Sequence, residues 1–237
     1  MAAAEIIKKI RQYCKAHGNA AQVKKYQRFF KEGYDAYGLD LATYDSGLKM
    51  IMDDGITLKV ILEAAPDLIK SGKYEETSFV LSLLKRRNSE FSAKTFKEIE
   101  KWFKIGIINW AHADMLAGDI VPVFIQKGIV PLDALKSWQK SENKFQRRIS
   151  AVSLIKLLKG GKDAAMLIKF VEPLMTDSAR EVHQGVGWFL REAWVIDKKK
   201  TEPFLLKWKN TAPRLIYQYA TEKMTPLEKQ KFRKEKK

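Results

Sequence analysis

Apolar residues recur at intervals of three and four along almost the whole chain, the spacing of one face of an α-helix. Residues 3–16 are the first example, with an apolar stripe that comprises Ile6, Ile7, Ile10 and Tyr13. After a stop at Gly18 and a cap at Asn19, a second helix is predicted to turn inward its apolar residues Val23, Tyr26, Phe29 and Phe30. No segment alternates convincingly with period two, so the pattern predicts no β-strand.

The same pattern predicts helices along the rest of the chain. A loop rich in glycine and aromatic residues is expected at 33–40, and Pro66 is expected to split a helix over 57–71 at Ala65. Ser92 is expected to cap a helix, and the helix from about residue 108 is expected to break near Gly118 and Pro122. The other predicted helices lie at about 41–53, 74–87, 131–138, 143–159, 164–175 and 179–195.

These elements predict an all-α fold with roughly twelve to fourteen helices in a period of about 35–40 residues. Such spacing favours an α-solenoid of stacked antiparallel HEAT- or armadillo-like helical pairs, curved and with a basic concave face. We expect one HEAT-like-repeat domain over residues 1–237. Two alternatives stay open for its basic tail, residues 226–237: disorder, or contact with DNA.

Charge narrows the choice of partner. The 237 residues carry a net charge of +16, and residues 198–237 alone contain 13 Lys and Arg against 4 Glu, a net of +9. This balance favours nucleic acid or an anionic membrane surface, although a tail that only aids solubility has the same composition. A basic concave face has the right shape for a rod-like polyanion such as duplex DNA.

Several classes of protein are not expected. No apolar run is long enough to span a membrane, and the first residues lack the apolar block of a secretory signal, so cytoplasm is the expected compartment. Cys14 is the single cysteine, and the three histidines are far apart, which argues against disulfides and metal sites. No nucleotide-binding glycine motif occurs, and we expect no cofactor.

Three groups of residues could carry chemistry. Trp110 and Asp114 are one turn apart on a predicted helix and therefore share a face. Taken alone, such a pair is more often a core indole and a solvated or capping carboxylate. The other two groups each lie on one side of a later helix and comprise Lys144, Arg147 and Arg148, and then Gln184, Trp188 and Arg191.

Three motifs together resemble a known family. Asn109-Trp110-Ala-His-Ala-Asp114, Phe145-Gln146-Arg147 and Gly187-Trp188-Phe-Leu-Arg191-Glu192 are similar to segments of the bacterial alkylpurine DNA glycosylases built from HEAT-like repeats, the AlkD superfamily. The likeness covers most of the chain in spacing and is sharpest from about 107 to 194. It implies a curved, all-helical protein that grips duplex DNA in its concavity and removes N3- or N7-alkylated purines, without a requirement for base flipping. The sequence shows no sign of oligomerisation, and we expect a monomer.

The resemblance also assigns roles. It implies that Trp110 and Trp188 lie against the damaged nucleotide, that Asp114 serves the chemistry, and that Arg147 holds a backbone phosphate. We expect further DNA contacts from Arg148, Lys144, Gln184 and Arg191; for Arg191, an ion pair with a neighbouring helix is an equal alternative. A purine alkylated at N3 or N7 is cationic and departs neutral, so one carboxylate suffices where ordinary glycoside hydrolysis needs two.

One departure from the family pattern leaves an alternative open. Asp40 stands where active relatives usually carry an amide side chain near DNA, and a carboxylate there would repel phosphate. Some branches of the superfamily bind branched or distorted DNA without excising a base. A non-catalytic DNA-binding protein is therefore the alternative to the glycosylase, and a protein-binding solenoid is the third candidate.

Overall fold

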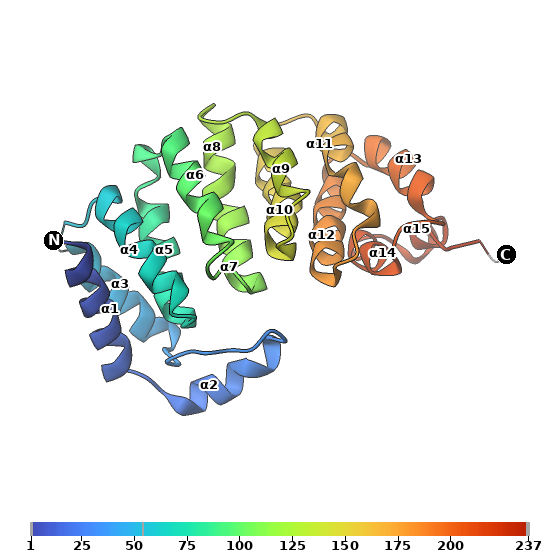
Figure 1. The fold of residues 1–237 in the computed structure, drawn as a ribbon. Helices are drawn as coiled ribbons and strands as arrows, with labels where there is room; N and C mark the ends of the chain where they lie inside the picture. Colours follow the sequence, from blue (N-terminus) through green and yellow to red (C-terminus); the bar gives the residue numbers. More distant parts are fainter. Residues whose placement is uncertain (1, 54, 236–237) are drawn as a thin grey trace. The chain divides into compact units, whose positions relative to one another are not determined.

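The structure, a computed structural model, describes residues 2–53 and 55–235, and these residues are helical with no β-strand among them (Figure 1). The predicted fold class, all-α with helices packed pairwise as in an α-solenoid, is confirmed. The chain consists of two compact units, Met1–Met115 and Leu116–Lys237. No described helix is both long and apolar enough to cross a bilayer.

The first unit contains seven α-helices and two short 3₁₀ turns among its described residues. They are α1 (Ala3–Ala16), α2 (Ala20–Tyr26), η1 (Gln27–Phe29), α3 (Leu41–Asp53), α4 (Leu58–Lys70), α5 (Tyr74–Arg86), η2 (Asn88–Glu90), α6 (Ala93–Trp102) and α7 (Trp110–Met115). Helix α5 lies at the centre of this unit, because α1, α3, α4 and α7 all pack on it and eight of its residues from Thr77 to Leu84 are buried.

The second unit is built around α10 and α12, which pack on each other. Its elements are η3 (Leu116–Ile120), α8 (Val121–Gln126), η4 (Leu132–Ala134), α9 (Leu135–Trp138), α10 (Lys144–Lys159), α11 (Ala164–Val171), η5 (Glu172–Thr176), α12 (Arg180–Ile196), α13 (Lys198–Trp208), α14 (Arg214–Ala220) and α15 (Pro226–Gln230). Of the tail expected at 226–237, residues 226–230 form α15, Phe232 is buried against Trp194, and residues 236 and 237 lie outside the described residues.

Local sequence signals explain most helix boundaries. Ser92 caps α6 as predicted, and its hydroxyl accepts a hydrogen bond from the backbone N–H of Thr95. The predicted break near Gly118 appears as the π-helical turn η3 directly before α8. Pro122 has no N–H and its ring crowds the carbonyl four residues earlier, so a wider turn relieves the helix at this point.

Two expectations about helices are wrong. Pro66 does not split its helix, because α4 runs unbroken from Leu58 to Lys70. Six of its residues are buried, and packing on α1 and α5 offsets the backbone hydrogen bond that proline removes. The helix expected to turn Tyr26 and Phe29 inward ends at Tyr26, and these two side chains are 37% and 50% exposed.

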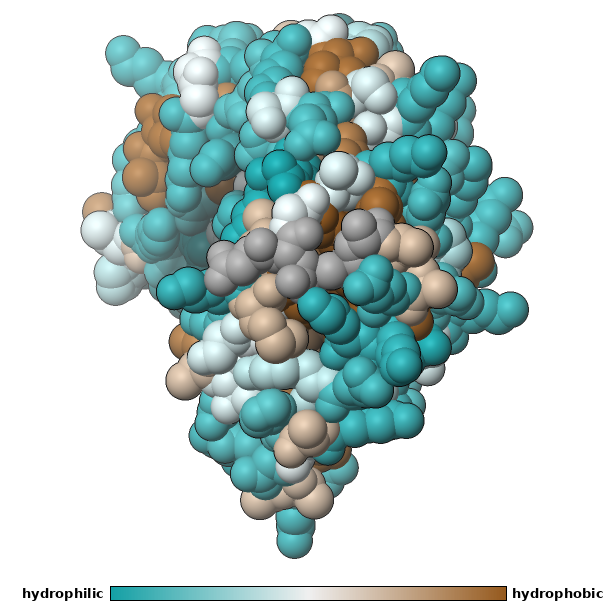
Figure 2. Space-filling view, turned by 90° about the vertical axis from the view of Figure 1, so that its left-hand side faces the viewer, coloured by the Kyte–Doolittle hydropathy of each residue, from teal (hydrophilic) through white to brown (hydrophobic). Residues whose placement is uncertain are grey.

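One face of the molecule is drawn with its side chains in Figure 2 and is mostly polar. Figure 2 shows hydrophilic side chains over most of the face it draws, with hydrophobic ones in small separate groups. Apolar residues gather inside instead. The largest buried side chains include Trp102 and Phe79 in the first unit, and Trp138, Tyr217 and Phe189 in the second.

Gly187 sets how closely α12 and α14 approach. A Cβ atom at this position would lie 2.6 Å from the carbonyl oxygen of Ile216 and 2.6 Å from the Cβ of Tyr219. The backbone of α14 would have to move to make room. Gly118 is a matched contrast in the same unit, because a Cβ there would meet nothing within 4 Å.

His112 fastens α7 to α5. Its Nε2–H lies 3.1 Å from the carbonyl oxygen of Tyr74 and 3.1 Å from the hydroxyl of Ser78, while the side-chain amide of Asn109 donates to Nδ1 over 2.8 Å. This pattern requires the neutral imidazole with its proton on Nε2. Burial lowers the pKa of His112 from 6.5 to about 4, because desolvation penalises the charged ring.

We predict that Gly187→Ala destabilises the protein although alanine is the better helix former. Overpacking against α14 should lower the free energy of unfolding by about 1–3 kcal/mol, more than the gain of about 1 kcal/mol in helix propensity. Urea unfolding measures this change, with Gly118→Ala as the control that should not lose stability. Equal stability of the two variants would show that α14 can move away from the added methyl group without a loss in the free energy of unfolding.

We also predict a pH dependence from His112. Its folded pKa is below the unfolded value, so its contribution to stability is full above pH 6.5 and is lost as the pH falls toward 4. The wild type should therefore lose about 3 kcal/mol relative to His112→Gln between pH 7 and pH 4. Urea unfolding of both proteins across this range provides the comparison, and parallel pH profiles would contradict the assignment.

Candidate functional site

Trp110 is held at the start of α7 by a segment far away in the sequence. Its indole Nε1–H donates a hydrogen bond of 3.1 Å to the backbone carbonyl of Phe29. Its ring stacks on Phe30, with ring centroids 5.5 Å apart and planes within 16°. The side chain is still 41% exposed. The predicted core role for an isolated tryptophan therefore does not apply here, because Trp110 is oriented by its partners and remains accessible.

Asp114 follows one turn later on the same short helix, as the sequence pattern predicts. Its side chain is half-buried and has interaction partners. The side-chain oxygen of Asn109 caps this helix by accepting the backbone N–H of His112 over 2.9 Å. Asn109 and His112 together therefore fix the orientation of the helix that carries Trp110 and Asp114.

The rings next to Trp110 form an aromatic cluster. Phe30 stacks on Tyr34 with centroids 4.6 Å apart and meets the edge of Tyr74 at 5.5 Å. Tyr34 and Tyr74 are 5.2 Å apart, and Tyr74 in turn stacks on His112 at 4.7 Å. The loop after α2 is thereby joined to both α5 and α7 through ring contacts.

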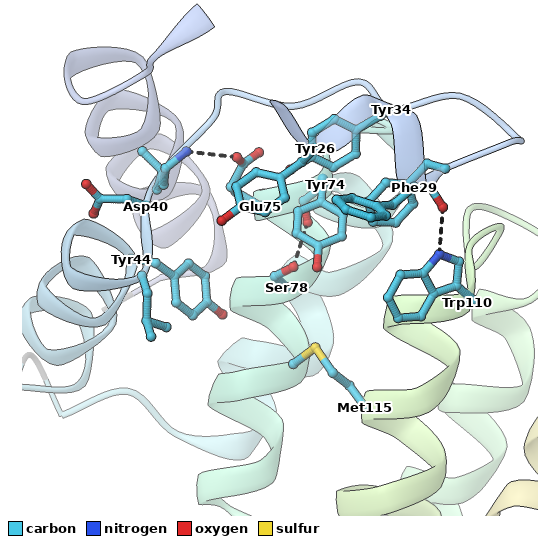
Figure 3. Close-up of a pocket in the computed structure, with 13 residues that line it drawn as sticks. Tyr26, Phe29, Tyr34, Asp40, Tyr44, Tyr74, Glu75, Ser78, Trp110 and Met115 are labelled. Atoms are coloured by element: carbon cyan, nitrogen blue, oxygen red, sulfur yellow. Dashed lines mark hydrogen bonds between the residues drawn. The ribbon is translucent and has the colours of Figure 1, made fainter. Parts of the chain in front are cut away.

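A pocket of about 530 Å³ opens beside this cluster (Figure 3). Its lining is mostly aromatic and comprises Tyr26, Phe29, Phe30, Tyr34, Leu39, Asp40, Leu41, Tyr44, Tyr74, Glu75, Ser78, Trp110 and Met115. In Figure 3, Asp40 and Tyr44 lie on the opposite side of the pocket from Trp110. A pocket of this size, walled by π faces, suits a planar or cationic group.

Asp40 acts as the N-cap of α3. Its carboxylate accepts the backbone N–H of Thr43 over 2.8 Å, and this bond lowers the pKa of the carboxyl group. An amide oxygen could accept the same bond, so aspartate and asparagine are equivalent for capping. Capping is therefore compatible with either residue and does not explain why an Asp stands where the family resemblance leads one to expect an amide. Its exposed negative charge lies at the pocket rim.

In the second unit, Arg147 on α10 is held by an ion pair. Its Nε and Nη2 donate to the two oxygens of Asp177 over 2.7 and 3.1 Å, and its Nη1 donates to the backbone carbonyls of Ser141 and Glu142. The two side chains are 15% and 7% exposed. The guanidinium is therefore fixed in one orientation before any ligand binds.

The two neighbouring cations, Lys144 and Arg148, both contact Glu181. Lys144 forms an ion pair of 3.1 Å with Glu181, and Arg148 donates to the backbone carbonyl of Glu181 over 2.7 Å. Arg148 is buried, since its Cγ packs where Gly185 of α12 has no side chain. Arg148 is thus more deeply buried than Lys144 and Arg147, the two half-buried cations with which the sequence pattern groups it.

Two of the three residues predicted on one face of α12, Gln184 and Arg191, also have protein partners. Gln184 donates to the hydroxyl of Tyr219 over 2.8 Å, and Trp188 is half-buried. Arg191 pairs with Glu192 at 3.0 Å and with Glu222, the ion pair that the sequence analysis offers as its alternative role. Burial opposes the charged form of Arg191, but the bonds to Glu222 and Glu192 outweigh it and raise its pKa.

Many C-terminal lysines are similarly paired with carboxylates. Lys198 lies 2.5 Å from Glu228, Lys207 lies 2.5 Å from Glu172, and Lys231 lies 2.6 Å from Glu202. Such exposed pairs contribute little to stability, but each lowers the local positive field. Glu172 lies outside residues 198–237, and so do Asp163 and Glu192, which pair with Lys200 and Lys223. Part of the excess charge of residues 198–237 is therefore balanced by carboxylates elsewhere in the second unit.

The structure thus groups the predicted residues in two sets. Trp110 and Asp114 share α7 in the first unit, and the remaining six lie on the adjacent helices α10 and α12 in the second. Over residues 2–53 and 55–235, no group of three or more His, Cys, Asp or Glu side chains lies where it could hold a metal ion. Sequence reasoning missed the rings around Trp110, although five aromatic residues between 26 and 37 were a signal.

Comparisons with known proteins bear on the fold and the family of this chain. No curated protein matches the sequence significantly. A solved structure titled a predicted DNA alkylation repair enzyme from Enterococcus faecalis superposes with a TM-score of 0.76 over 89% of this chain and 98% of that chain. The two sequences are 13% identical, so this likeness shows the fold alone. A model of the DNA alkylation repair enzyme family matches residues 10–224. The chain therefore belongs to the DNA alkylation repair enzyme family.

Proposed function

We propose that this protein is a monofunctional DNA glycosylase that hydrolyses the N-glycosidic bond of N3- or N7-alkylated purines in duplex DNA. The observation that carries the proposal is the accessible indole of Trp110, held by Phe29 and Phe30 one helical turn from Asp114. Membership in a DNA alkylation repair family supports DNA as the substrate.

In this proposal, Asp114 acts on the sugar rather than on the base. Alkylation at N3 or N7 makes the purine cationic, and breaking the glycosidic bond returns the bonding electrons to the purine, which leaves neutral. The sugar then carries the positive charge. The Asp114 carboxylate stabilises that oxocarbenium-like sugar and orients the water that attacks its anomeric carbon.

Trp110 and Trp188 are proposed to contact the damaged nucleotide. An indole face stabilises a nearby cation by about 0.5–2 kcal/mol, more when the site excludes water. The restraint of Trp110 by Phe29 and Phe30 removes most of its rotational freedom before DNA binds, so less entropy is lost on binding.

Four residues of α10 and α12 are proposed as DNA contacts: Lys144, Arg147, Gln184 and Arg191. Arg148, also expected as a contact, is 6% exposed and donates to the carbonyl of Glu181, so we assign it to the packing of α10 on α12 instead. Arg147 is the best supported, because four of its five N–H groups have partners among the described residues and the fifth, on Nη2, is left for a phosphate oxygen. Asp177 holds the guanidinium plane in place and reduces its net charge, so the contact is directional.

We predict that Asp114→Asn abolishes excision and preserves DNA binding. The rate of release of N7-methylguanine from a duplex under single-turnover conditions should fall about 100-fold or more, because an amide cannot offset the positive sugar. Affinity for the same duplex should change by less than about twofold.

Asp133→Asn is the control for this test, because Asp133 is an exposed carboxylate that pairs with Lys136 outside the site. Its excision rate should match the wild type. Tight DNA binding by a wild type that releases no base would instead support a non-catalytic protein for distorted DNA. A wild type without DNA affinity at low salt would leave a protein-binding solenoid.

We also predict that Arg147 contributes one phosphate contact. Because removing Arg147 alone would leave the buried Asp177 carboxylate unpaired, the test uses the double variant Arg147→Ala/Asp177→Asn. Its dissociation constant for undamaged duplex, measured against salt concentration, should show a log–log slope lower by about one. Asp177→Asn alone is the control and should keep the wild-type slope. An unchanged slope in the double variant would assign Arg147 to folding only.

A further inference from the structure

Residues 19–37, here named the α2 lobe, leave the helical stack at Asn19 and return to it at Tyr37. The backbone N–H of Asn19 donates to the carbonyl of Tyr37 over 2.8 Å, which closes the base of the lobe. Gly38 follows with a φ of +86°, and a Cβ there would lie 2.2 Å from the carbonyl oxygen of Asn19. The two ends of the lobe therefore touch through backbone, with no room for a side chain.

Glu75 fixes that base to the rest of the unit. It lies in the first turn of α5 and is 3% exposed. One carboxylate oxygen accepts the N–H of Tyr37 over 2.8 Å, and the other accepts the N–H groups of Gly38 and Leu39 over 2.7 and 3.1 Å. A buried carboxylate is costly unless hydrogen-bonded, and these three bonds satisfy both the carboxylate and the turn.

Neighbouring contacts strengthen the same attachment. Glu76 accepts the hydroxyl of Tyr37 over 2.7 Å and pairs with Arg11 of α1 at 3.1 Å. The carbonyl of Asp35 accepts the N–H of Tyr74 over 2.7 Å. The N-terminus of α5 carries a partial positive charge, and this charge stabilises the carboxylate of Glu75 in the first turn.

The other end of the lobe carries the two groups that hold Trp110. The carbonyl of Phe29 accepts its Nε1–H, and the ring of Phe30 stacks on its indole. Both residues follow α2, which contains no buried residue, so its packing contributes little to fixing its place. The position of the lobe thus depends mainly on its base and its ring contacts.

We propose that Glu75 is a positioning residue for Trp110: its buried carboxylate fixes the backbone of residues 37–39, this fixes the α2 lobe, and the lobe holds the indole at the pocket. The inference rests on the proposed function for its effect on excision. Its structural part, the link from Glu75 to the indole Nε1–H, stands without it.

The test follows the Nε1–H resonance of Trp110 in the full-length protein by NMR, identified by its absence in Trp110→Phe. In Glu75→Ala, exchange of this proton with solvent should be at least tenfold faster than in the wild type, and the amides of Tyr37, Gly38 and Leu39 should also lose protection. Glu75→Gln keeps one acceptor oxygen, so its rate of exchange at the Trp110 Nε1–H should lie between those of the wild type and Glu75→Ala. Single-turnover excision should slow about tenfold in Glu75→Ala, with DNA affinity within about twofold of wild type.

A second variant tests the same link if Glu75→Ala does not fold. Gly38→Ala forces the ends of the lobe apart by its clash with Asn19 and should also speed exchange of the Trp110 proton. Its matched control is Gly33→Ala, with a φ of +100° and nothing within 4 Å of the added Cβ. That control carries similar backbone strain in the lobe, but the exchange rate of the Trp110 indole proton should stay at the wild-type value.

Two results would overturn the inference. One is that the amides of residues 37–39 exchange faster in Glu75→Ala or Gly38→Ala, while the Trp110 Nε1–H exchanges at the wild-type rate. The other is faster exchange of that proton with unchanged excision by an active enzyme, which would overturn the effect of Glu75 on excision. A wild type that does not excise alkylated purines would defeat the proposed function, whereas the exchange data would still decide whether Glu75 positions Trp110.

Discussion

The first unit depends on a contact between residues that are 81 positions apart in sequence. The carbonyl of Phe29 accepts the indole proton of Trp110, and Phe30 covers one face of the same ring. Neither partner belongs to the core of the helical stack. Without this contact, Trp110 would be an exposed side chain at the start of a six-residue helix, free to occupy several rotamers. With it, an accessible aromatic surface has one orientation beside Asp114.

In the second unit, carboxylates perform a similar task for cations. Asp177, Glu181 and Glu192 are largely buried and each holds at least one basic side chain of α10 or α12. Glu192 also pairs with Lys159 and Lys223, so three cations converge on one carboxylate, and these bonds outweigh the effect of burial and lower its pKa. The carboxylates therefore hold the basic side chains in fixed orientations and neutralise part of their positive charge. Fixed, partly neutralised groups favour specific contacts with a polyanion over nonspecific electrostatic attraction.

Much of the fold was predictable because helical periodicity and caps are local signals. The stripes along α1, α6 and α10, the cap at Ser92 and the irregular turn before Pro122 all follow from residues within a few positions of one another. The motifs around Trp110 and Trp188 pointed to the family because each motif also consists of residues that are close together in the sequence. Pro66 was misjudged because burial of α4 against α1 and α5 overrides a local preference. The aromatic pocket and the Glu75 attachment were missed because they join segments about 35 to 80 residues apart, and the loop that forms them has no period.

In the proposed reaction, one carboxylate suffices because the departing base is already cationic. The most direct measurement is single-turnover release of base by the wild-type protein from two duplexes that differ only at one purine, N7-methylguanine in one and the neutral purine hypoxanthine in the other. We expect release of N7-methylguanine and none of hypoxanthine, because a neutral purine would need a general acid to leave. Comparable release of both bases would contradict it.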